Sequence, residues 1–314
     1  MIVYLFKRSM YALLVILIVS MLICFLIRLL PGDPISIMLG ERITPQLEQE
    51  LKKLYALDRP IYEQYIIWLK QILKGTWGVS IRSQRPVLAS ITSALEPSLF
   101  LAFGGWILSF VIGVGTGLIA AVYRNTWRDY IASTLAFIGL AIPQFFLGLL
   151  LMLLFAFYLK IFPPTGYVSP FTNALEAVKR LVLPTLTIGL TMAAMVARIT
   201  RSSVLEVIKE DYVKTARAKG LPEIRVILRH VLKPAMITIV TVSGLQLGYL
   251  LGGVVVVENI YAIPGLGSLI VNAAFLRDYP MVQGCVLIFA IWFVLINVFV
   301  DMFYAVLDPR IQYE

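Results

Sequence analysis

The residues of this sequence that could do chemistry are few and far apart. The chain has one histidine, His230, and two cysteines, Cys24 and Cys285, which lie inside apolar stretches and predict no disulfide framework. A metal site or a nucleophilic triad needs several such groups together, so His230 alone predicts neither. The Gly-x4-Gly-Lys-Ser/Thr pattern of a phosphate loop is absent, and no strand precedes Gly265 and Gly267. We therefore expect no catalytic residue, cofactor or metal in this chain.

The composition excludes a water-soluble enzyme and a disordered protein. Of 314 residues, 60% are hydrophobic and 14% are charged, with a mean hydropathy of +0.87. A soluble domain has about half apolar and about a quarter charged residues, and a globule of this size leaves roughly a quarter of its unfolded-chain surface exposed. The net charge of +9 is concentrated between apolar runs. These features predict a polytopic membrane protein.

Apolar runs long enough to cross a bilayer set the expected fold. In hydrocarbon every backbone amide needs a partner within the segment, so each run must be a helix. We expect Pro143 to kink the third run, and the fourth helix to continue past Arg198 and Arg201, whose long side chains can reach the interface. The fold class is therefore all-α, with six transmembrane helices predicted at 9–30, 99–122, 131–159, 181–197, 234–257 and 281–300.

The distribution of basic residues predicts the orientation. With the N-terminus inside, the inner segments carry 14 Lys or Arg residues and the short outer loops carry four, so both termini are expected in the cytoplasm. Lys7 and Arg8 before the first apolar run are typical of a signal peptide, but no small-x-small cleavage site follows them. We expect a retained helix. The predicted divisions are an N-terminal helix at 1–30, an extracytoplasmic insert at 31–98, a five-helix core at 99–307 and a cytoplasmic tail at 308–314.

The outer insert is predicted to be helical. Thr44-Pro45 is a helix start followed by Leu47, Leu51, Leu54 and Tyr55 at helical spacing. A second helix is expected at 61–74, ending at Gly75, with Tyr65, Trp68, Leu69 and Ile72 on its apolar side. These helices fit two interpretations, interfacial helices on the bilayer and a platform for an extracytoplasmic partner. A short re-entrant or interfacial helix is also expected within the 258–280 loop, after its Pro and Gly residues.

The polar region at about 198–233 is the most informative. A short helix beginning near Asp211 has acidic residues first and basic residues last, as the helix dipole favours. Gly220 is placed to end it in a left-handed cap, with Pro222 two residues later. Thr215, Ala216 and Ala218 are small, and we expect them to leave a low surface that fits a groove on another protein. The alternative is a solvated positive-inside loop.

This region resembles the cytoplasmic signature loop of binding-protein-dependent ABC importer permeases, as worded in the dipeptide, oligopeptide, nickel and glutathione branch. Lys214 replaces the Glu of the general pattern, and Pro234 falls one place later than the general proline. The similarity continues in Leu30-Pro31-Gly32-Asp33-Pro34, Glu258-Asn259-Ile260, Pro264-Gly265-Leu266-Gly267 and Arg277-Asp278-Tyr279-Pro280. The expected ATPase-coupling residues are Asp211, Tyr212, Lys214, Thr215, Ala216, Arg217, Ala218, Lys219 and Gly220.

The resemblance implies a type I ABC importer permease in a bacterial or archaeal cytoplasmic membrane. The chain would be the first of two homologous permeases, with two cytoplasmic ATPase subunits that bind ATP and Mg and an extracytoplasmic binding protein. It would do no chemistry and would form a path for short peptides. Glutathione and chelated nickel are the alternatives within the family. An ion-driven secondary transporter is the alternative from another class, but the inverted repeats and paired intramembrane charges expected of one are not evident.

Polar and small residues inside the runs suggest the path and the packing. Polar groups within a span usually face protein or water, and the candidates for the path are Gln144, Gln246, Gln283 and Asn297. Glycines at a spacing of four let membrane helices approach closely, as at Gly113 and Gly117 and at Gly244, Gly248 and Gly252. They fit packing within this chain, or a moving contact between the fifth span and the partner permease.

Overall fold

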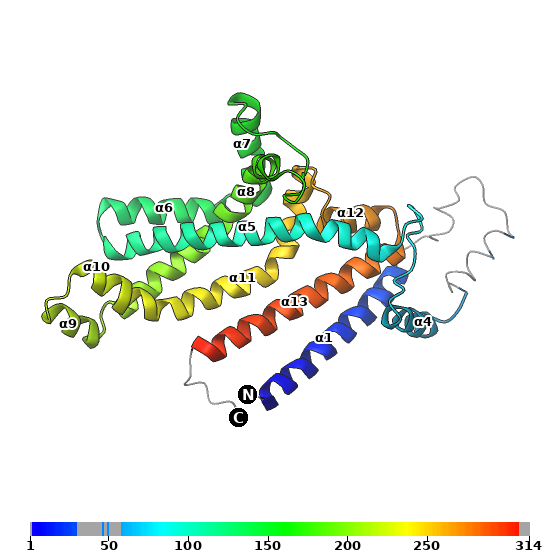
Figure 1. Cartoon of the computed structure of the whole chain (residues 1–314), viewed down its shortest axis with the longest axis horizontal. Coiled ribbons are helices and arrows are strands. Elements are labelled where there is room, and N and C mark those ends of the chain that lie inside the picture. Colours follow the sequence, from blue (N-terminus) through cyan, green and yellow to red (C-terminus); the bar gives the residue numbers. More distant parts are fainter. Residues whose placement is uncertain (1, 30–45, 47–48, 50–57, 308–314) are drawn as a thin grey trace. The chain divides into compact units, whose positions relative to one another are not determined.

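The computed structural model describes residues 2–29, 46, 49 and 58–307, which are almost entirely helical (Figure 1). An isolated antiparallel bridge joins Val79 and Pro86. The helices are α1 (Ile2–Leu29), α4 (Ile61–Leu73), α5 (Val87–Val122), α6 (Trp127–Ala141), α7 (Gln144–Leu151), the π-helix η2 (Met152–Tyr158), α8 (Ala174–Val207), α9 (Asp211–Ala218), α10 (Glu223–Arg225), the π-helix η3 (Val226–Leu232), α11 (Lys233–Ile260), α12 (Leu266–Phe275) and α13 (Tyr279–Leu307).

Five helices of the described chain are long and apolar enough to cross a membrane, and there are six candidate spans if α6 with α7–η2 is one span. They match the predicted runs, and α8 continues past Arg198 and Arg201 to Val207 as expected. The predicted break at Pro143 is confirmed, but the two halves differ in direction by 106°. Ile142 before the proline is extended, with φ −77° and ψ 122°, since proline disfavours a helical residue before it.

The chain divides into two compact units, and the first comprises residues 1–96 and 264–295. Here α4 packs on α1, where the Tyr65 hydroxyl lies 2.9 Å from Ser20 Oγ and Trp68 is buried beside Cys24. Leu69 and Ile72 pack against the same cluster, so the predicted apolar side of this helix is confirmed. Gly75 follows it with φ +79°. The other predicted insert helix, starting at Thr44-Pro45, lies largely outside the described residues.

A turn in the same unit is tied to the start of α13 by Asp278. Its buried carboxylate accepts hydrogen bonds from Ser80 Oγ and from the backbone N–H of Ile81 at 3.2 Å. The backbone N–H of Met281, in the first turn of α13, is 3.4 Å from the same carboxylate. The short apolar helix α12 precedes this residue, which confirms the helix predicted within the 258–280 loop.

The second unit comprises residues 97–263 and 296–314 and is organised around α8. Glycines of α5 allow the close approach of these two helices: a Cβ atom at Gly113 would lie 2.5 Å from Val196 Cβ, and one at Gly117 would overlap the Ala197 carbonyl. These two glycines therefore pack helices of the chain itself. Helices α6, α7 and α11 also contact α8, and α9 and α10 lie together at one end of α8 and α11 (Figure 1).

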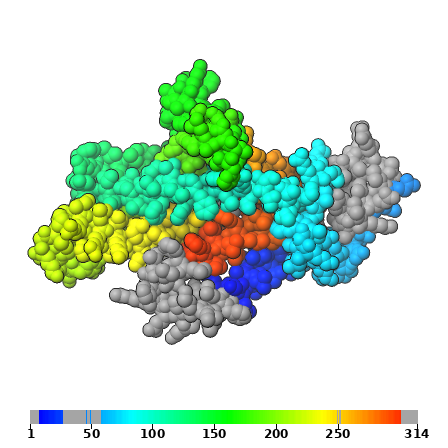
Figure 2. Space-filling model, in the orientation of Figure 1, coloured from blue at the N-terminus to red at the C-terminus, as the bar shows by residue number. Residues whose placement is uncertain are grey.

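The broken pair α6–α7 is held in place by a buried tyrosine. Tyr261, just after α11, donates from its hydroxyl to the Gly148 carbonyl at 3.0 Å and lies 3.0 Å from Thr187 Oγ1 on α8. Its own carbonyl accepts from the backbone N–H of Gly166 at 2.9 Å. The residues of α7 and η2, drawn green in Figure 2, nevertheless stand out from the rest of this unit, and Phe157 is 69% exposed.

Candidate functional site

Helix α9 forms as the sequence predicts, with Asp211 in its first turn and Arg217 in its last. Lys214 Nζ lies 2.8 Å from Asp211 Oδ1, and the ammonium group lowers the pKa of this carboxyl. Both side chains are exposed, so the pair contributes little to stability. The Thr215 hydroxyl donates to the Asp211 carbonyl at 2.9 Å. These interactions are all local to the helix.

The inner face of α9 is fixed by apolar contacts. Val213 is fully buried and Ala216 is 6% exposed, in a cluster that includes Val204 of α8 and Val226 and Val231 of η3. The expectation that Ala216 lies on a low outer surface is therefore wrong, because η3 returns beneath α9 and covers it. The exposed residues of this segment are Asp211, Tyr212, Lys214, Thr215, Arg217, Ala218, Lys219 and Gly220.

The turn after α9 has the predicted left-handed glycine. Gly220 has φ +74°, and a Cβ atom there would meet nothing within 4 Å. Its backbone N–H donates to the Arg217 carbonyl at 2.9 Å. The Arg217 guanidinium then bridges to Glu223 of α10 through Nε–Oε2 at 3.1 Å and Nη2–Oε1 at 2.7 Å. The turn thus sets the angle between α9 and the following helix.

The polar residues proposed for a path lie on three helices, α7, α11 and α13. Gln144 is the first residue of α7, directly after the break, and Gln246 lies on α11 with a buried Oε1 that has no hydrogen-bond partner among the described residues. Asn297 is half-buried on α13. Gln283, also on α13, is 4% exposed and belongs to the first unit. Whether any of them contacts a substrate stays a prediction.

The glycines of the fifth span differ in their surroundings. A Cβ atom at Gly244 would lie 2.8 Å from Val300 Cγ2 on α13, so this glycine permits packing within the chain. Gly248 is also buried. A Cβ atom at Gly252 would meet nothing within 4 Å in the described chain. A contact between this span and another permease therefore stays a prediction at Gly252.

His230 lies in η3 and is half-buried. The described residues contain no group of three or more His, Cys, Asp or Glu side chains that could hold a metal ion.

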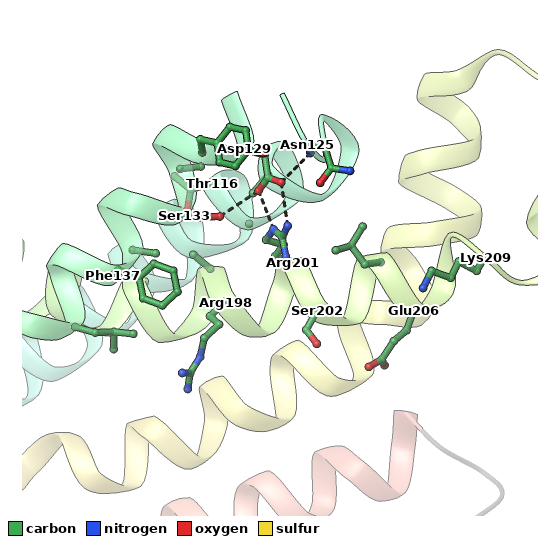
Figure 3. Close-up of a pocket in the computed structure, with 18 residues that line it drawn as sticks. Thr116, Asn125, Asp129, Ser133, Phe137, Arg198, Arg201, Ser202, Glu206 and Lys209 are labelled. Carbon is green, nitrogen blue, oxygen red and sulfur yellow. Dashed lines mark hydrogen bonds and ion pairs between the residues drawn. The ribbon is translucent and has the colours of Figure 1, made fainter. Parts of the chain in front are cut away.

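An ion pair that the sequence did not reveal lies beside a cavity of about 630 Å³ between α6 and α8 (Figure 3). Arg201 of α8 donates to both carboxylate oxygens of Asp129, from Nε at 2.8 Å and from Nη2 at 2.9 Å. The Asn125 backbone N–H at 3.0 Å and Ser133 Oγ at 3.1 Å complete the shell around this carboxylate. The sequence signal was a carboxylate just before the apolar run at 131–159 and an arginine just after the run at 181–197.

Two protein families together match nearly the whole chain. The family described as "Binding-protein-dependent transport system inner membrane component" matches residues 113–313. A second, described as "Binding-prot-dependent transport system membrane comp, N-term", matches residues 1–98.

Relatives match along their full length. The glutathione transport system permease protein GsiC of Escherichia coli strain K12 is 39% identical over 311 residues, and that of Salmonella typhi is 40% identical; each alignment covers 99% of both chains. Among solved structures, the inward-facing MetNI methionine ABC transporter matches with a TM-score of 0.55 at 20% identity, covering 70% of this chain and 97% of that chain. An amino acid ABC transporter matches with a TM-score of 0.52 at 14% identity, covering 69% and 94%. These two structures show the permease fold.

Proposed function

This chain belongs to the family of binding-protein-dependent transport system inner membrane components, and from this premise we propose that it forms part of the path by which glutathione enters the cell. It is a multi-pass inner membrane permease subunit of an ABC importer. ATP hydrolysis resides in its partner subunits, and permeases of this family carry no cofactor. Membership implies ATPase partners, an extracytoplasmic binding protein and a second permease.

The choice of glutathione as the substrate rests on the sequence identity of 39–40% to glutathione permeases over 99% of both chains. Glutathione is a tripeptide, so this proposal narrows the expectation of short peptides to one peptide with an unusual γ-linkage. Dipeptides, longer peptides and chelated nickel are the competing cargoes. The binding protein does most of the selection in such systems, and the permease must provide a path of suitable size and polarity.

The proposed topology has six spans, with α6 and α7–η2 counted as one broken span and both termini in the cytoplasm. The surplus of basic residues in the inner segments supports this orientation. The 31–98 segment then lies outside and can receive the binding protein, and the 198–233 region lies inside. A second, homologous permease would cover Gly252.

The proposed coupling surface is the exposed face of α9, including Tyr212 and Thr215, seated in a groove of one of two ATPase subunits. Val213 and Ala216 anchor this helix to α8 and η3. A displacement of α9 would therefore be transmitted to α8 and, through η3, to α11. ATP-driven closure of the ATPases would in this way change the access of the path from one side to the other.

Reconstitution tests the function directly. The chain, its partner permease and the ATPases are placed in liposomes that contain ATP, and labelled glutathione is added outside with the binding protein. We expect uptake that requires hydrolysable ATP and the binding protein, and that unlabelled glutathione suppresses better than a dipeptide or a nickel chelate does. Stronger suppression by a dipeptide or a nickel chelate would show that this competitor, and not glutathione, is the preferred substrate. Uptake driven by an ion gradient alone would contradict the transporter class.

A further inference from the structure

The segment between α4 and α5 ends in a tight hairpin that carries two arginines (Figure 1). The isolated bridge between Val79 and Pro86 closes its base. Arg82 and Arg85 lie within it, and all residues from 82 to 86 are exposed. No carboxylate of the described residues pairs with either guanidinium, and residues 79–86 include no acidic residue. The hairpin therefore presents two positive charges that nothing in the described chain neutralises.

Hydrogen bonds fix the backbone of this hairpin. The backbone N–H of Ser80 donates to the Arg85 carbonyl at 2.9 Å, and that of Gln84 donates to the Ser80 carbonyl at 3.1 Å. Ser80 Oγ accepts from the backbone N–H of Ser83 at 2.9 Å and donates to the buried carboxylate of Asp278. A backbone that is already ordered loses little conformational entropy when a partner binds. The two arginines are thus held on a preformed surface.

An apolar groove of about 570 Å³ lies against the hairpin. Val79 and Pro86, which close the hairpin, line it together with Trp77, Leu88 and Ala89. Val79 is 39% and Leu88 is 37% exposed, so apolar surface is open here beside the two cations. Anchor side chains that enter a pocket, and arginines around them, contribute most of the binding energy at many protein interfaces. The groove and the hairpin together have this arrangement.

The length of α5 favours a partner in water over a lipid. The apolar run at 99–122 has 24 residues, which is more than a hydrocarbon core of about 30 Å requires. Residues 87–98 are therefore not needed to cross the bilayer, and at about 1.5 Å per residue they add about 18 Å of helix before the run begins. Thr92 and Ser93 in this part of α5 are exposed and polar. The hairpin precedes these residues, so its arginines are separated from the acyl chains.

We propose that the hairpin at 79–86 and the adjoining groove form the contact for an acidic loop of the extracytoplasmic binding protein. This inference rests on the proposed function, in which the chain is a permease with the 31–98 segment outside. Carboxylates of the loop pair with Arg82 and Arg85, and an apolar side chain of the same loop enters the groove beside Trp77. Because Asp278 joins the hairpin to the first turn of α13, docking acts directly on the start of that helix.

The affinity of the binding protein for the assembled complex tests the two arginines. The complex is placed in nanodiscs of neutral lipid, and the dissociation constant of the system's own purified binding protein is measured at low and at high salt. We expect Arg82→Ala/Arg85→Ala to bind about tenfold more weakly at low salt, which corresponds to about 1.4 kcal/mol shared by two exposed ion pairs. Salt should weaken docking of the wild type more than that of the double variant, because salt screens exposed charges.

A matched control removes two exposed cations elsewhere in the same unit. Arg59→Ala/Lys70→Ala changes the net charge equally at α4 and should dock normally. Neither guanidinium of the hairpin bonds to the described chain, so Arg82→Ala/Arg85→Ala should unfold at the wild-type temperature. Unchanged affinity in the hairpin variant would overturn the proposed contact. An equal loss of affinity in both double variants would also overturn it, because the effect would then come from net charge alone.

A photo-cross-linker identifies the occupant of this surface independently of affinity. Benzoylphenylalanine replaces the exposed Ser83 of the hairpin. A cross-link to a carboxylate-rich segment of the binding protein supports the proposal. A cross-link to another segment or to the second permease, a phospholipid adduct, or no adduct overturns it. Neither readout involves transport, so a system that carries another substrate would still dock its own binding protein here. Glutathione uptake would in turn survive the failure of this contact.

Discussion

Asp129 and Arg201 are 72 residues apart and form a two-point ion pair that joins the start of α6 to α8. The carboxylate side chain is 4% exposed and the guanidinium side chain 33%. A buried carboxylate without its cation would be an uncompensated charge, so the pair constrains both helices at the cavity. Helix α6 leads to the break at Pro143, and α8 leads to the coupling surface on α9.

The first prediction removes one member of this pair. Arg201→Ala leaves the Asp129 carboxylate buried without a cation, and we expect a loss of about 3 kcal/mol of stability, seen as a midpoint of thermal unfolding lower by about 5–10 °C. Asp129→Ala/Arg201→Met removes both charges and should be milder. If the single variant unfolds at the wild-type temperature, the ion pair has no stabilising role.

The second prediction separates the two faces of α9. Ala216→Trp forces a large side chain into the cluster around Val226, and overpacking of this kind costs about 1–3 kcal/mol or more. Thr215→Trp places the same side chain on the exposed face, so the permease should unfold at its normal temperature but retain the ATPases poorly. Unfolding midpoints and ATPase co-purification measure the two effects. Normal ATPase retention in Thr215→Trp would show that this face of α9 does not contact the ATPases.

Signals within a few residues were enough to predict several elements. The helix at 61–74, the glycine that ends α9, α12 and the break at Pro143 follow from spacing, caps and proline chemistry near each position. The buried state of Ala216 could not be predicted from α9 alone, because it depends on where η3 returns. The same holds for Asp129 and Arg201: each resembles an ordinary interfacial charge, and only the packing of α6 on α8 brings them together.

The third prediction concerns topology. A cysteine in place of Gln49 should react with an impermeant thiol reagent added outside intact cells, and one in place of Lys219 should react only after the membrane is opened. Both native cysteines are fully buried, so they should give little background. Labelling of the Lys219 variant from outside would reverse the proposed orientation.

The fourth prediction concerns Asp278. Asp278→Ala removes the acceptor for Ser80, Ile81 and the first turn of α13, and the loss of a helix cap costs about 0.5–2 kcal/mol. If the binding protein docks on this side, we expect weaker docking with normal ATPase retention. Asp278→Asn keeps an acceptor oxygen and should be closer to wild type. The measurement is the affinity of the purified binding protein for the complex. Unchanged affinity in both variants would show that this turn has no role in docking.

The last prediction tests the turn that follows α9. Gly220 has φ +74° and open space around its missing Cβ, so a substitution there meets no neighbour and acts through the backbone alone. A β-branched residue in left-handed geometry costs about 1–2 kcal/mol, and asparagine adopts this geometry more readily. Gly220→Val should therefore shift the angle between α9 and α10 and uncouple transport, whereas Gly220→Asn should transport nearly normally.

The readout compares ATP hydrolysis with glutathione uptake in the same liposomes. We expect Gly220→Val to insert and to bind the binding protein, and either to retain the ATPases poorly or to hydrolyse ATP without uptake. Exposed Lys214, whose side chain can reorient, serves as the matched position on the helix itself, and Lys214→Ala should have a smaller effect. Normal uptake per ATP in Gly220→Val would contradict the assignment of this turn to coupling, because strain at φ +74° is the only change that the substitution introduces within this chain.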